Sequence, residues 1–334
     1  MKYIRGFFSG LFIVLLILDS KTALSGALEG LDLSLRVVIP SLFPFFFLSI
    51  LFTSSISDMR IPFLKNISAT LGLPAGAEGL LISSFIGGYP VGAQAIGEYH
   101  RQGQLTVEDS RRMLAFCSNA GPAFFFGMNS RLFSSAKTLW LLWGIHILSA
   151  FLVGWILPGK SKKQTSVHNF KKLSLTDVLF QAIRAMAGIC GWVVLFRVLL
   201  QILGRWLFWA LPQTVTIILS GILELSNGCL LLNTLESEGL RFILCSVFLS
   251  LGGVCILMQT TSVVSSCGLG SYIPGKILQS VFSFLLASLS APWIYKKWII
   301  SVPAMVLAAA VGIFCIVVLK KTQNKDSIPA ICGV

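Results

Sequence analysis

The chain has 334 residues, of which 55% are hydrophobic and only 12% are charged. Soluble globular domains carry about 25% charged residues, so this composition excludes a water-soluble core. The formal net charge of +13 does not indicate a nucleic-acid partner, because the basic residues lie in short segments between apolar blocks, as in the cytoplasmic loops of membrane proteins. We therefore predict an all-α polytopic membrane protein that binds no nucleic acid.

The N-terminal elements are predicted to be two apolar spans with an amphipathic stretch between them. Residues 3–18 form a short apolar run that begins next to Lys2 and Arg5, and no A-x-A cleavage site follows. This favours an uncleaved first span over a cleaved signal peptide. An amphipathic stretch is expected at 20–36 and a second span at 37–56, so residues 1–36 form the first region of the chain.

A Gly-rich apolar segment follows at residues 74–101. Its centre, residues 87–92, reads Gly-Gly-Tyr-Pro-Val-Gly, and Gly and Pro at this density break a helix. Each flanking arm has about ten apolar residues, too few to cross a bilayer. We predict a re-entrant hairpin, whose broken backbone must be buried in protein or line an aqueous cavity.

The remaining elements continue the same pattern and bring the total to eight spans and two hairpins. A basic loop within residues 158–176 divides the chain into halves, and residues 294–334 hold the last span and a basic tail. The expected spans are 107–133 (interrupted near 119–122), 138–157, 177–203, 240–262 (containing Gly252-Gly253), 275–293 and 299–319, and the second hairpin is expected at 213–238.

The distribution of Lys and Arg places both termini on the cytoplasmic side. Under this topology the inner segments hold about twice as many Lys and Arg residues as the outer segments. Lys276, at the start of the span at 275–293, is counted among the inner residues. Arg197 falls within a span and is expected to snorkel toward the surface.

Motifs for catalysis and metal binding are not found in the sequence. No nucleophile-elbow, Walker A or H-E-x-x-H motif occurs, so we expect no enzyme activity and no cofactor. The cysteines form no C-x-x-C pairs, and the three histidines are scattered, which indicates no metal site. His146 lies within a span and is expected to be a packed, hydrogen-bonded residue.

The two halves of the chain follow one plan. Residues 37–157 and residues 177–293 each read span, hairpin, interrupted span, span. Gly92 corresponds to Gly228, and Gly121 corresponds to Gly252 or Gly253. The hairpins would open on opposite sides, and inverted repeats with interrupted helices are typical of alternating-access transporters. The alternative is a chance similarity of hydropathy between two halves of a membrane protein.

Candidate binding residues lie at the helix breaks. A half-helix that starts at Pro90 would expose N–H groups that attract an anion. Pro122 can open another half-helix, with Ser118 or Asn119 near its cap. The structural alternatives are tight packing of small residues and a proline kink.

Glu224 is the clearest intramembrane acid, and such acids are functional by default. It could bind a coupling proton or Na+, anchor Asn227, or form an ion pair with Arg197 or Arg184. In contrast, Thr106 is predicted to have a structural role as a helix cap. The complete set of predicted substrate-binding residues is Gly88, Tyr89, Pro90, Gln94, Ser118, Asn119, Glu224, Ser226, Asn227 and Gln259.

Three segments carry a resemblance to a known family. Residues 40–46 (Pro-Ser-Leu-Phe-Pro-Phe-Phe), 88–93 (Gly-Tyr-Pro-Val-Gly-Ala) and 119–127 (Asn-Ala-Gly-Pro-Ala-Phe-Phe-Phe-Gly) closely resemble the YlbJ-type (SpoVV) sporulation integral membrane protein family. Residues 224–228 resemble the second-half motif of that family. The overall plan is also similar to the nucleoside-recognition, or gate, fold of concentrative nucleoside transporters.

The resemblance implies a protein of endospore formers in the outer forespore membrane of the mother cell. It also implies transport of dipicolinic acid toward the forespore. We hypothesise alternating-access transport of a small organic anion, with dipicolinate as the expected substrate. Its partners would be the lipid bilayer and other proteins of the forespore membranes. The rival hypotheses are a non-transporting scaffold for spore envelope assembly and a carrier of nucleosides or ions.

Overall fold

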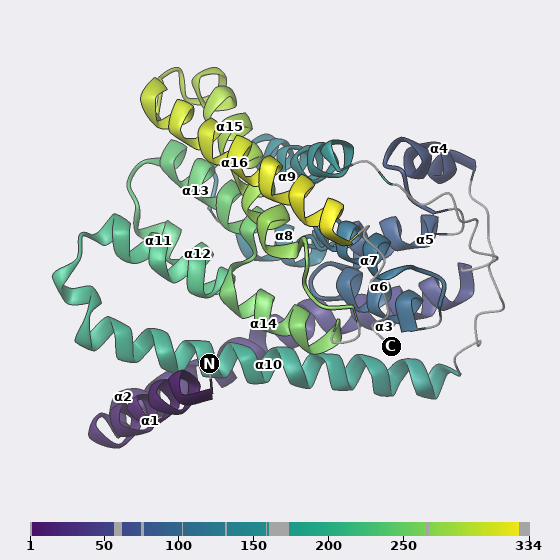
Figure 1. Ribbon diagram of the computed structural model, residues 1–334. Helices are drawn as coiled ribbons and strands as arrows, with labels where there is room; N and C mark the ends of the chain where they lie inside the picture. Colours follow the sequence, from purple (N-terminus) through teal and green to yellow (C-terminus); the bar gives the residue numbers. More distant parts are fainter. Residues whose placement is uncertain are drawn as a thin grey trace.

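The structure is a computed structural model that describes residues 2–56, 62–74, 77–101, 103–130, 132–157, 159, 174–264 and 267–326. The described part is helical (Figure 1). Within it, six helices are long and apolar enough to cross a membrane, which agrees with the predicted polytopic membrane protein. They are Ser20–Phe52, Ala136–Ile156, Leu175–Trp206, Glu238–Val263, Tyr272–Tyr295 and Val302–Lys321.

The N-terminal region differs from the prediction. Helix α1 (Lys2–Leu18) is shorter than the six candidate spans. Helix α2 (Ser20–Leu33) then continues through a π-helical turn (Ser34–Val38) into α3 (Ile39–Ile56), so the predicted boundary at residue 37 is wrong. Several polar residues of this stretch are paired, as in the ion pair of Arg36 with Asp32 one turn earlier and that of Glu29 with Arg197 of the helix at 175–206.

The first half contains the predicted broken elements. After α4 (Pro62–Thr70), the hairpin arms are α5 (Glu78–Ile82), extended by a π-helical turn (Ser83–Gly87), and α6 (Val91–Arg101). The span expected at 107–133 is divided into α7 (Val107–Leu114) and α8 (Pro122–Asn129), and α9 (Ala136–Ile156) follows. The predicted cap at Thr106 is confirmed, since its hydroxyl accepts a hydrogen bond from the Asp109 N–H at 3.0 Å.

The second half begins at α10 (Leu175–Trp206), and most of the predicted basic loop before it lies outside the described residues. The second hairpin consists of α11 (Gln213–Leu223) and α12 (Leu225–Leu231). Helices α13 (Glu238–Leu251) and α14 (Gly253–Val263) are separated at Gly252, whose φ of 78° lies in the left-handed region that favours glycine. The chain continues into α15 (Tyr272–Tyr295) and α16 (Val302–Asp326).

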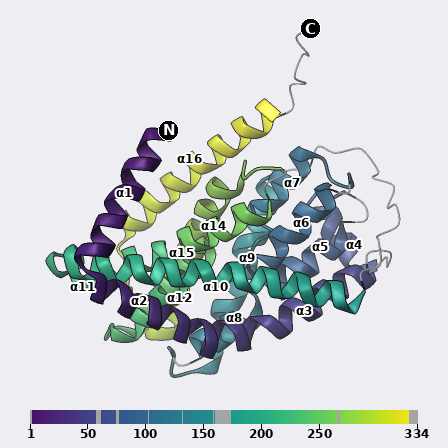
Figure 2. The same cartoon turned by 90° about the horizontal axis from the view of Figure 1, so that it is seen from below.

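The long helices surround the short broken ones. Figures 1 and 2 show α5 and α6 near one end of α10, and α11 and α12 near its other end. Helix α15 packs against α9, α13 and α16, whereas α10 packs against α2 and α3. A Cβ atom added at Gly26 or Gly30 of α2 would lie 2.8 Å from the Cα atom of Val198 or Val194, so these glycines allow α2 to lie directly on the backbone of α10.

Candidate functional site

The first hairpin meets the break between α7 and α8, and we call this contact the first crossing. A Cβ atom added at Gly88 would lie 2.6 Å from the nitrogen of Gly121. A Cβ atom added at Gly92 of α6 would lie even closer to the carbonyl oxygen of Cys117, a residue of the same break. A side chain at either position would therefore force two backbone segments apart. Helix α6 begins at Val91, one residue after the predicted position of Pro90.

The second hairpin meets the break between α13 and α14 in a similar way, at the second crossing. Gly228 of α12 contacts the backbone of Gly221 in α11 and lies near the ring of Phe248. A Cβ atom added at Gly253 would lie 2.9 Å from the carbonyl oxygen of Ile222. Both crossings thus depend on glycines that let broken backbone segments touch.

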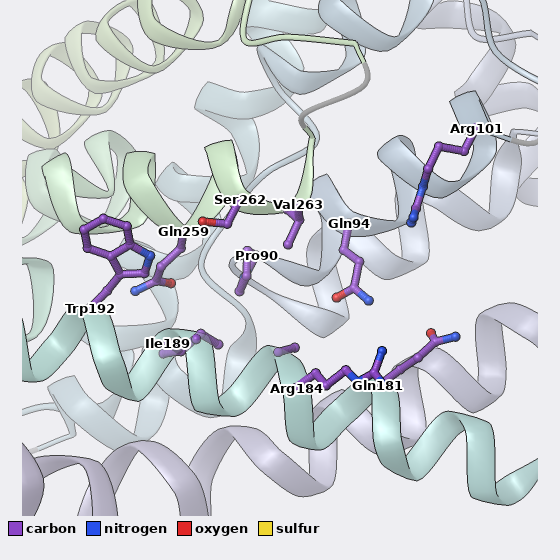
Figure 3. Close-up of a pocket in the computed structure, with 12 residues that line it drawn as sticks. Pro90, Gln94, Arg101, Gln181, Arg184, Ile189, Trp192, Gln259, Ser262 and Val263 are labelled. Carbon is purple, nitrogen blue, oxygen red and sulfur yellow. The ribbon is translucent and has the colours of Figure 1, made fainter. Parts of the chain in front are cut away.

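An open cleft with a volume of about 330 Å³ lies between α6, α10 and α14 (Figure 3). Figure 3 shows Gln94 and Arg101 on the α6 side and Gln181 and Arg184 on the α10 side of the cleft. Within the described part of the chain, Arg184 forms no ion pair, whereas Arg101 pairs with Glu98. The lining residues are Pro90, Gln94, Arg101, Gln181, Arg184, Ala185, Gly188, Ile189, Trp192, Gln259, Ser262 and Val263.

The cleft residues on α10 were not among the predicted site residues. Gln181, Arg184, Gly188 and Trp192 follow one another at a spacing of three or four residues, which places them on one face of the helix. A polar stripe on an otherwise apolar span is therefore the signal that could have revealed them. Gln94, which was predicted, carries a buried side-chain oxygen without a hydrogen-bond partner.

A smaller pocket of about 30 Å³ lies between the two crossings. Its polar lining comes from Tyr89, Glu224, Ser226 and Gln259, and Gln259 also lines the open cleft. Four predicted site residues from both halves are thus brought together. A volume of about 30 Å³ is the share of one water molecule in the liquid, so this pocket is too small for an organic ligand in the present conformation.

A buried lysine lies at the first crossing, where charge counting had placed a cytoplasmic loop residue. Lys276 of α15 is only 2% exposed, so its assignment to an inner loop is wrong. Its ammonium group donates to the carbonyl oxygen of Ser118 and to Oε1 of Gln279, the latter at 2.6 Å. The ammonium nitrogen also lies 5.1 Å from the centre of the Tyr89 ring, within the range of a cation–π interaction.

Asn119 belongs to the same buried network. Its side chain accepts a hydrogen bond from Gln279 at 3.0 Å and donates to the carbonyl oxygen of Phe116 at 2.7 Å. Ser118 and Asn119 lie near the start of the half-helix at Pro122, as predicted, but neither side chain caps it, because Gly121 occupies the cap position without a side-chain bond. Ser118, Asn119, Asn227 and Gly88 line neither the cleft nor the small pocket.

The network extends across the interior through α9 and α13. The main-chain N–H of Ala120 donates to Nε2 of His146 at 3.2 Å, which confirms the expectation of a packed, hydrogen-bonded histidine. Ser250 links His146 to Ser283, with distances of 3.3 and 2.5 Å. Ser283 donates in turn to Ser149 at 2.9 Å. Buried polar groups with these partners hold α9, α13 and α15 in one arrangement.

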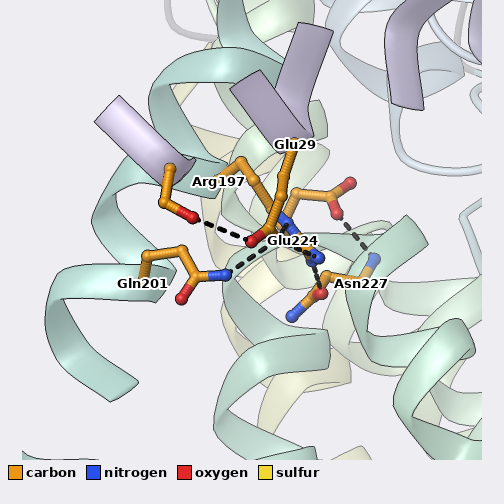
Figure 4. Close-up of polar contacts among 6 residues, drawn as sticks. Glu29, Arg197, Gln201, Glu224 and Asn227 are labelled. Carbon is orange, nitrogen blue, oxygen red and sulfur yellow. Dashed lines mark hydrogen bonds and ion pairs between the residues drawn. The ribbon is translucent and has the colours of Figure 1, made fainter. Parts of the chain in front are cut away.

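At the second crossing, Glu224 caps α12. Its carboxylate is 3% exposed and accepts hydrogen bonds from the N–H groups of Ser226 and Asn227 at 2.9 and 2.6 Å. The predicted anchoring of Asn227 is thus confirmed for its main chain (Figure 4). A carboxylate at this helix end is also favoured by the helix dipole.

Arg197 neither snorkels to the surface nor pairs directly with Glu224. Its guanidinium forms an ion pair with Glu29 of α2 at 2.8 Å and donates to the side-chain oxygen of Asn227 (Figure 4). Gln201 donates to the same Glu29 carboxylate at 2.8 Å. No ion pair of Glu224 with Arg197 or Arg184 occurs among the described residues, so of the alternatives left open for Glu224 the ion pair is not the one that the structure shows.

The six candidate spans and the polar interior built on broken helices define a multi-pass integral membrane protein. The chain is similar to the sporulation integral membrane protein YlbJ of Bacillus subtilis (strain 168). The two are 22% identical over 319 residues, which cover 80% of this chain and 78% of that protein. No protein-family model and no solved structure matches the chain. The relative supports the resemblance predicted from the sequence, and the likeness to a nucleoside-recognition fold stays a prediction.

Proposed function

We propose that the protein is an alternating-access carrier of a small organic anion, and that its substrate during endospore formation is dipicolinate. The observation that carries the proposal is the open cleft with Arg184 on its wall. The relative's printed name supports a role in sporulation. We further propose that the protein lies in the outer forespore membrane of the mother cell, which a fluorescent fusion imaged during engulfment would test.

The chemistry of the cleft fits a planar aromatic dicarboxylate. Arg184 offers a fork of N–H donors that matches a carboxylate in two parallel hydrogen bonds. Trp192 offers an aromatic surface for the pyridine ring, and the amides of Gln94 and Gln181 can donate to the second carboxylate. The volume of about 330 Å³ falls within the range of about 300–1,000 Å³ that is usual for small-molecule sites.

Alternating access is supported by the likeness of the two crossings. Gly92 contacts Cys117, four residues before Gly121, and Gly228 lies near Phe248, four residues before Gly252. The two hairpins also lie near opposite ends of α10 (Figures 1 and 2). We therefore propose that residues 37–157 and 177–293 form an inverted repeat, as in concentrative nucleoside transporters. Movement of the hairpins and interrupted helices of each repeat against the long helices α3 and α10 would open the small pocket and the cleft in turn.

Dipicolinate uptake into proteoliposomes tests the carrier function, with Arg184→Gln compared with the wild type. Losing a charge-assisted hydrogen bond costs about 1.5–3 kcal/mol, so we expect KM to rise roughly 10- to 150-fold. Arg205→Gln is the matched control, because Arg205 lies on the same helix, pairs with Asp19 and lines neither cavity. Absence of uptake by correctly folded wild-type protein would overturn the carrier proposal and favour a scaffold.

A further inference from the structure

We propose that the ammonium group of Lys276 occupies the position of a coupling cation, and that its proton is the ion whose movement drives transport without Na+. The proposal rests on the carrier function proposed above. Lys276, which would carry the coupling proton, lies outside the substrate cleft.

The Lys276 nitrogen is held by a main-chain carbonyl oxygen and a side-chain amide oxygen, which are typical cation ligands in membrane carriers. The carbonyl oxygen of Ser118 comes from the non-helical segment after α7, and Gln279 contributes an amide oxygen one turn along α15. Unwound carbonyls and the C-terminal ends of half-helices typically coordinate Na+ or H+ in secondary transporters. In this protein the ammonium group takes that place, so a separate metal cation has no room between the same oxygens.

The surroundings of Lys276 contain no compensating acid among the described residues. The charged groups of α7 lie or bind elsewhere: Arg112 donates to three main-chain carbonyls, Arg111 donates to that of Cys267, Asp109 accepts from Thr106, and Glu108 is exposed at the start of the helix. His146 accepts a hydrogen bond from the Ala120 N–H at Nε2, so this nitrogen carries no proton and the ring is neutral. The other titratable groups on the elements around this part of α15 include the buried Tyr89, Cys117, Tyr272 and Cys315 and the exposed Lys320 and Lys321 of α16.

A buried ammonium group without an opposite charge is expensive in a membrane interior, and such groups are functional by default. The tyrosine, cysteine and histidine groups around it are neutral near pH 7, so they do not fix its charge. Lys276 can therefore gain and lose a proton during the transport cycle. Arginine at the same position could not, because its guanidinium stays protonated.

We place the route of the proton to water past Tyr89. Tyr89 contacts the Lys276 ammonium with its ring and also lines the small pocket, which can hold about one water molecule. In the proposed step an N–H bond of the ammonium breaks, the electron pair stays on nitrogen, and a water molecule takes the proton. The neutral amine holds the Ser118 carbonyl less strongly, which frees the first crossing to move relative to α15. A proton from the opposite side then restores the ammonium.

Gradient-driven uptake tests this coupling in proteoliposomes of the full chain. We expect wild-type dipicolinate uptake to follow an imposed pH gradient and to be unchanged when choline replaces Na+. Lys276→Arg keeps the charge but cannot release a proton, so uptake driven by the pH gradient should fall roughly tenfold or more. Exchange of internal for external dipicolinate should persist, which a general loss of structure would not allow. Lys297→Arg, an exposed lysine beyond the end of α15, is the matched control.

Uptake that follows a Na+ gradient, or a Lys276→Arg variant with normal pH-driven uptake, would overturn the coupling role. Absence of uptake under every gradient would overturn the carrier function itself. Whether Na+ binds at this position can then be tested without a substrate. The measurement compares the thermal unfolding midpoint of the purified protein in NaCl with that in choline chloride. We expect equal midpoints for the wild type and a higher midpoint in NaCl for Lys276→Ala, where the site is vacated. A Na+-stabilised wild type would overturn the proposal even if no variant folds.

Discussion

At the first crossing a cation hydrogen-bonds to a backbone carbonyl group outside a helix. At the second crossing an anion hydrogen-bonds to the backbone N–H groups at the start of a helix. Lys276 donates to a carbonyl oxygen that follows α7, whereas Glu224 accepts from two N–H groups that begin α12. The signs follow from the helix dipole, which is negative at the end of a helix and positive at its start. Each crossing therefore contains a built-in charge that matches the helix end it faces.

The two crossings also differ in how much chain is non-helical. Seven residues, 115–121, separate α7 from α8, whereas a single glycine separates α13 from α14. Hydrocarbon supplies no water to satisfy exposed backbone groups, so the longer break needs more side-chain partners. The network through Asn119, His146 and Gln279 provides them. The difference teaches that a membrane protein can break a helix either briefly with glycine or at length with a buried polar network.

The largest expected effect comes from filling the glycine contact at either crossing. Gly92→Val and Gly228→Val each place a branched side chain against backbone atoms that lie closer than 3.0 Å to a Cβ position. Overpacking of a rigid site costs about 1–3 kcal/mol, and backbone clashes cost more. We expect both variants to lose the monodisperse peak in size-exclusion chromatography. Gly144→Val in α9, where nothing lies within 4 Å, should keep it. Tolerance at one crossing only would show that the crossings are not equivalent.

Removing the anion at the second crossing should have the next largest effect. Glu224→Ala leaves the N–H groups of Ser226 and Asn227 unpaired in a buried position, and we expect a loss of about 2 kcal/mol or more. The measurement is the thermal midpoint in detergent. Ser174→Ala removes an exposed cap at the start of α10 and should cost only about 1 kcal/mol. Equal effects of the two substitutions would contradict a special role for the buried carboxylate.

Asn119→Ala probes the polar network at the first crossing. It removes the shorter of the two hydrogen bonds that the Gln279 amide donates and leaves only the 3.5 Å bond to the carbonyl oxygen of His146, so the expected loss of stability is about 1–3 kcal/mol. Because Asn119 lines neither cavity, KM for dipicolinate should stay at the wild-type value in the folded fraction. A raised KM with normal stability would instead place Asn119 in contact with the substrate, as the sequence alone had suggested.

Tyr89→Phe should give the smallest change. The substitution removes the hydrogen bond from the tyrosine hydroxyl to the carbonyl oxygen of Leu249 (2.8 Å), which costs about 1 kcal/mol. It keeps the aromatic ring against Lys276, so proton-driven uptake should persist. Tyr89→Leu removes the ring as well and should weaken uptake further. Identical uptake in the two variants would show that the ring does not contribute to the lysine environment.

Much of the fold could be predicted from the sequence because glycine and proline mark the breaks directly. The Gly-Gly-Tyr-Pro segment at 87–90, Pro122 and Gly252 each lie where a helix starts or ends in the structure. The apolar blocks likewise located five of the six long helices, all but Ser20–Phe52. These signals are local, since they depend on backbone conformation and on the length needed to cross a bilayer.

The missed features depend on contacts between residues far apart in the chain. Lys276 was counted as a loop charge because its partner Ser118 lies 158 positions away. The ion pair of Arg197 with Glu29 spans 168 positions, and Glu29 consequently looked like part of a surface helix. Arg184 reaches the cleft only because α6 and α14 pack opposite it. The number of Lys and Arg residues in each segment of the sequence does not distinguish such interior charges from charges in loops.

The close contact of α2 with α10 has a mechanical consequence. Gly26 and Gly30 bring the two helix backbones together, and the ion pair of Glu29 with Arg197 fixes their register. Helix α2 runs into α3 without a gap, so α2, α3 and α10 form a stiff frame. The broken elements around this frame contain short non-helical joints, namely residues 115–121 between α7 and α8, Glu224 between α11 and α12, and Gly252 between α13 and α14. An ion gradient would therefore move the broken helices, while α2, α3 and α10 keep their position relative to the lipid.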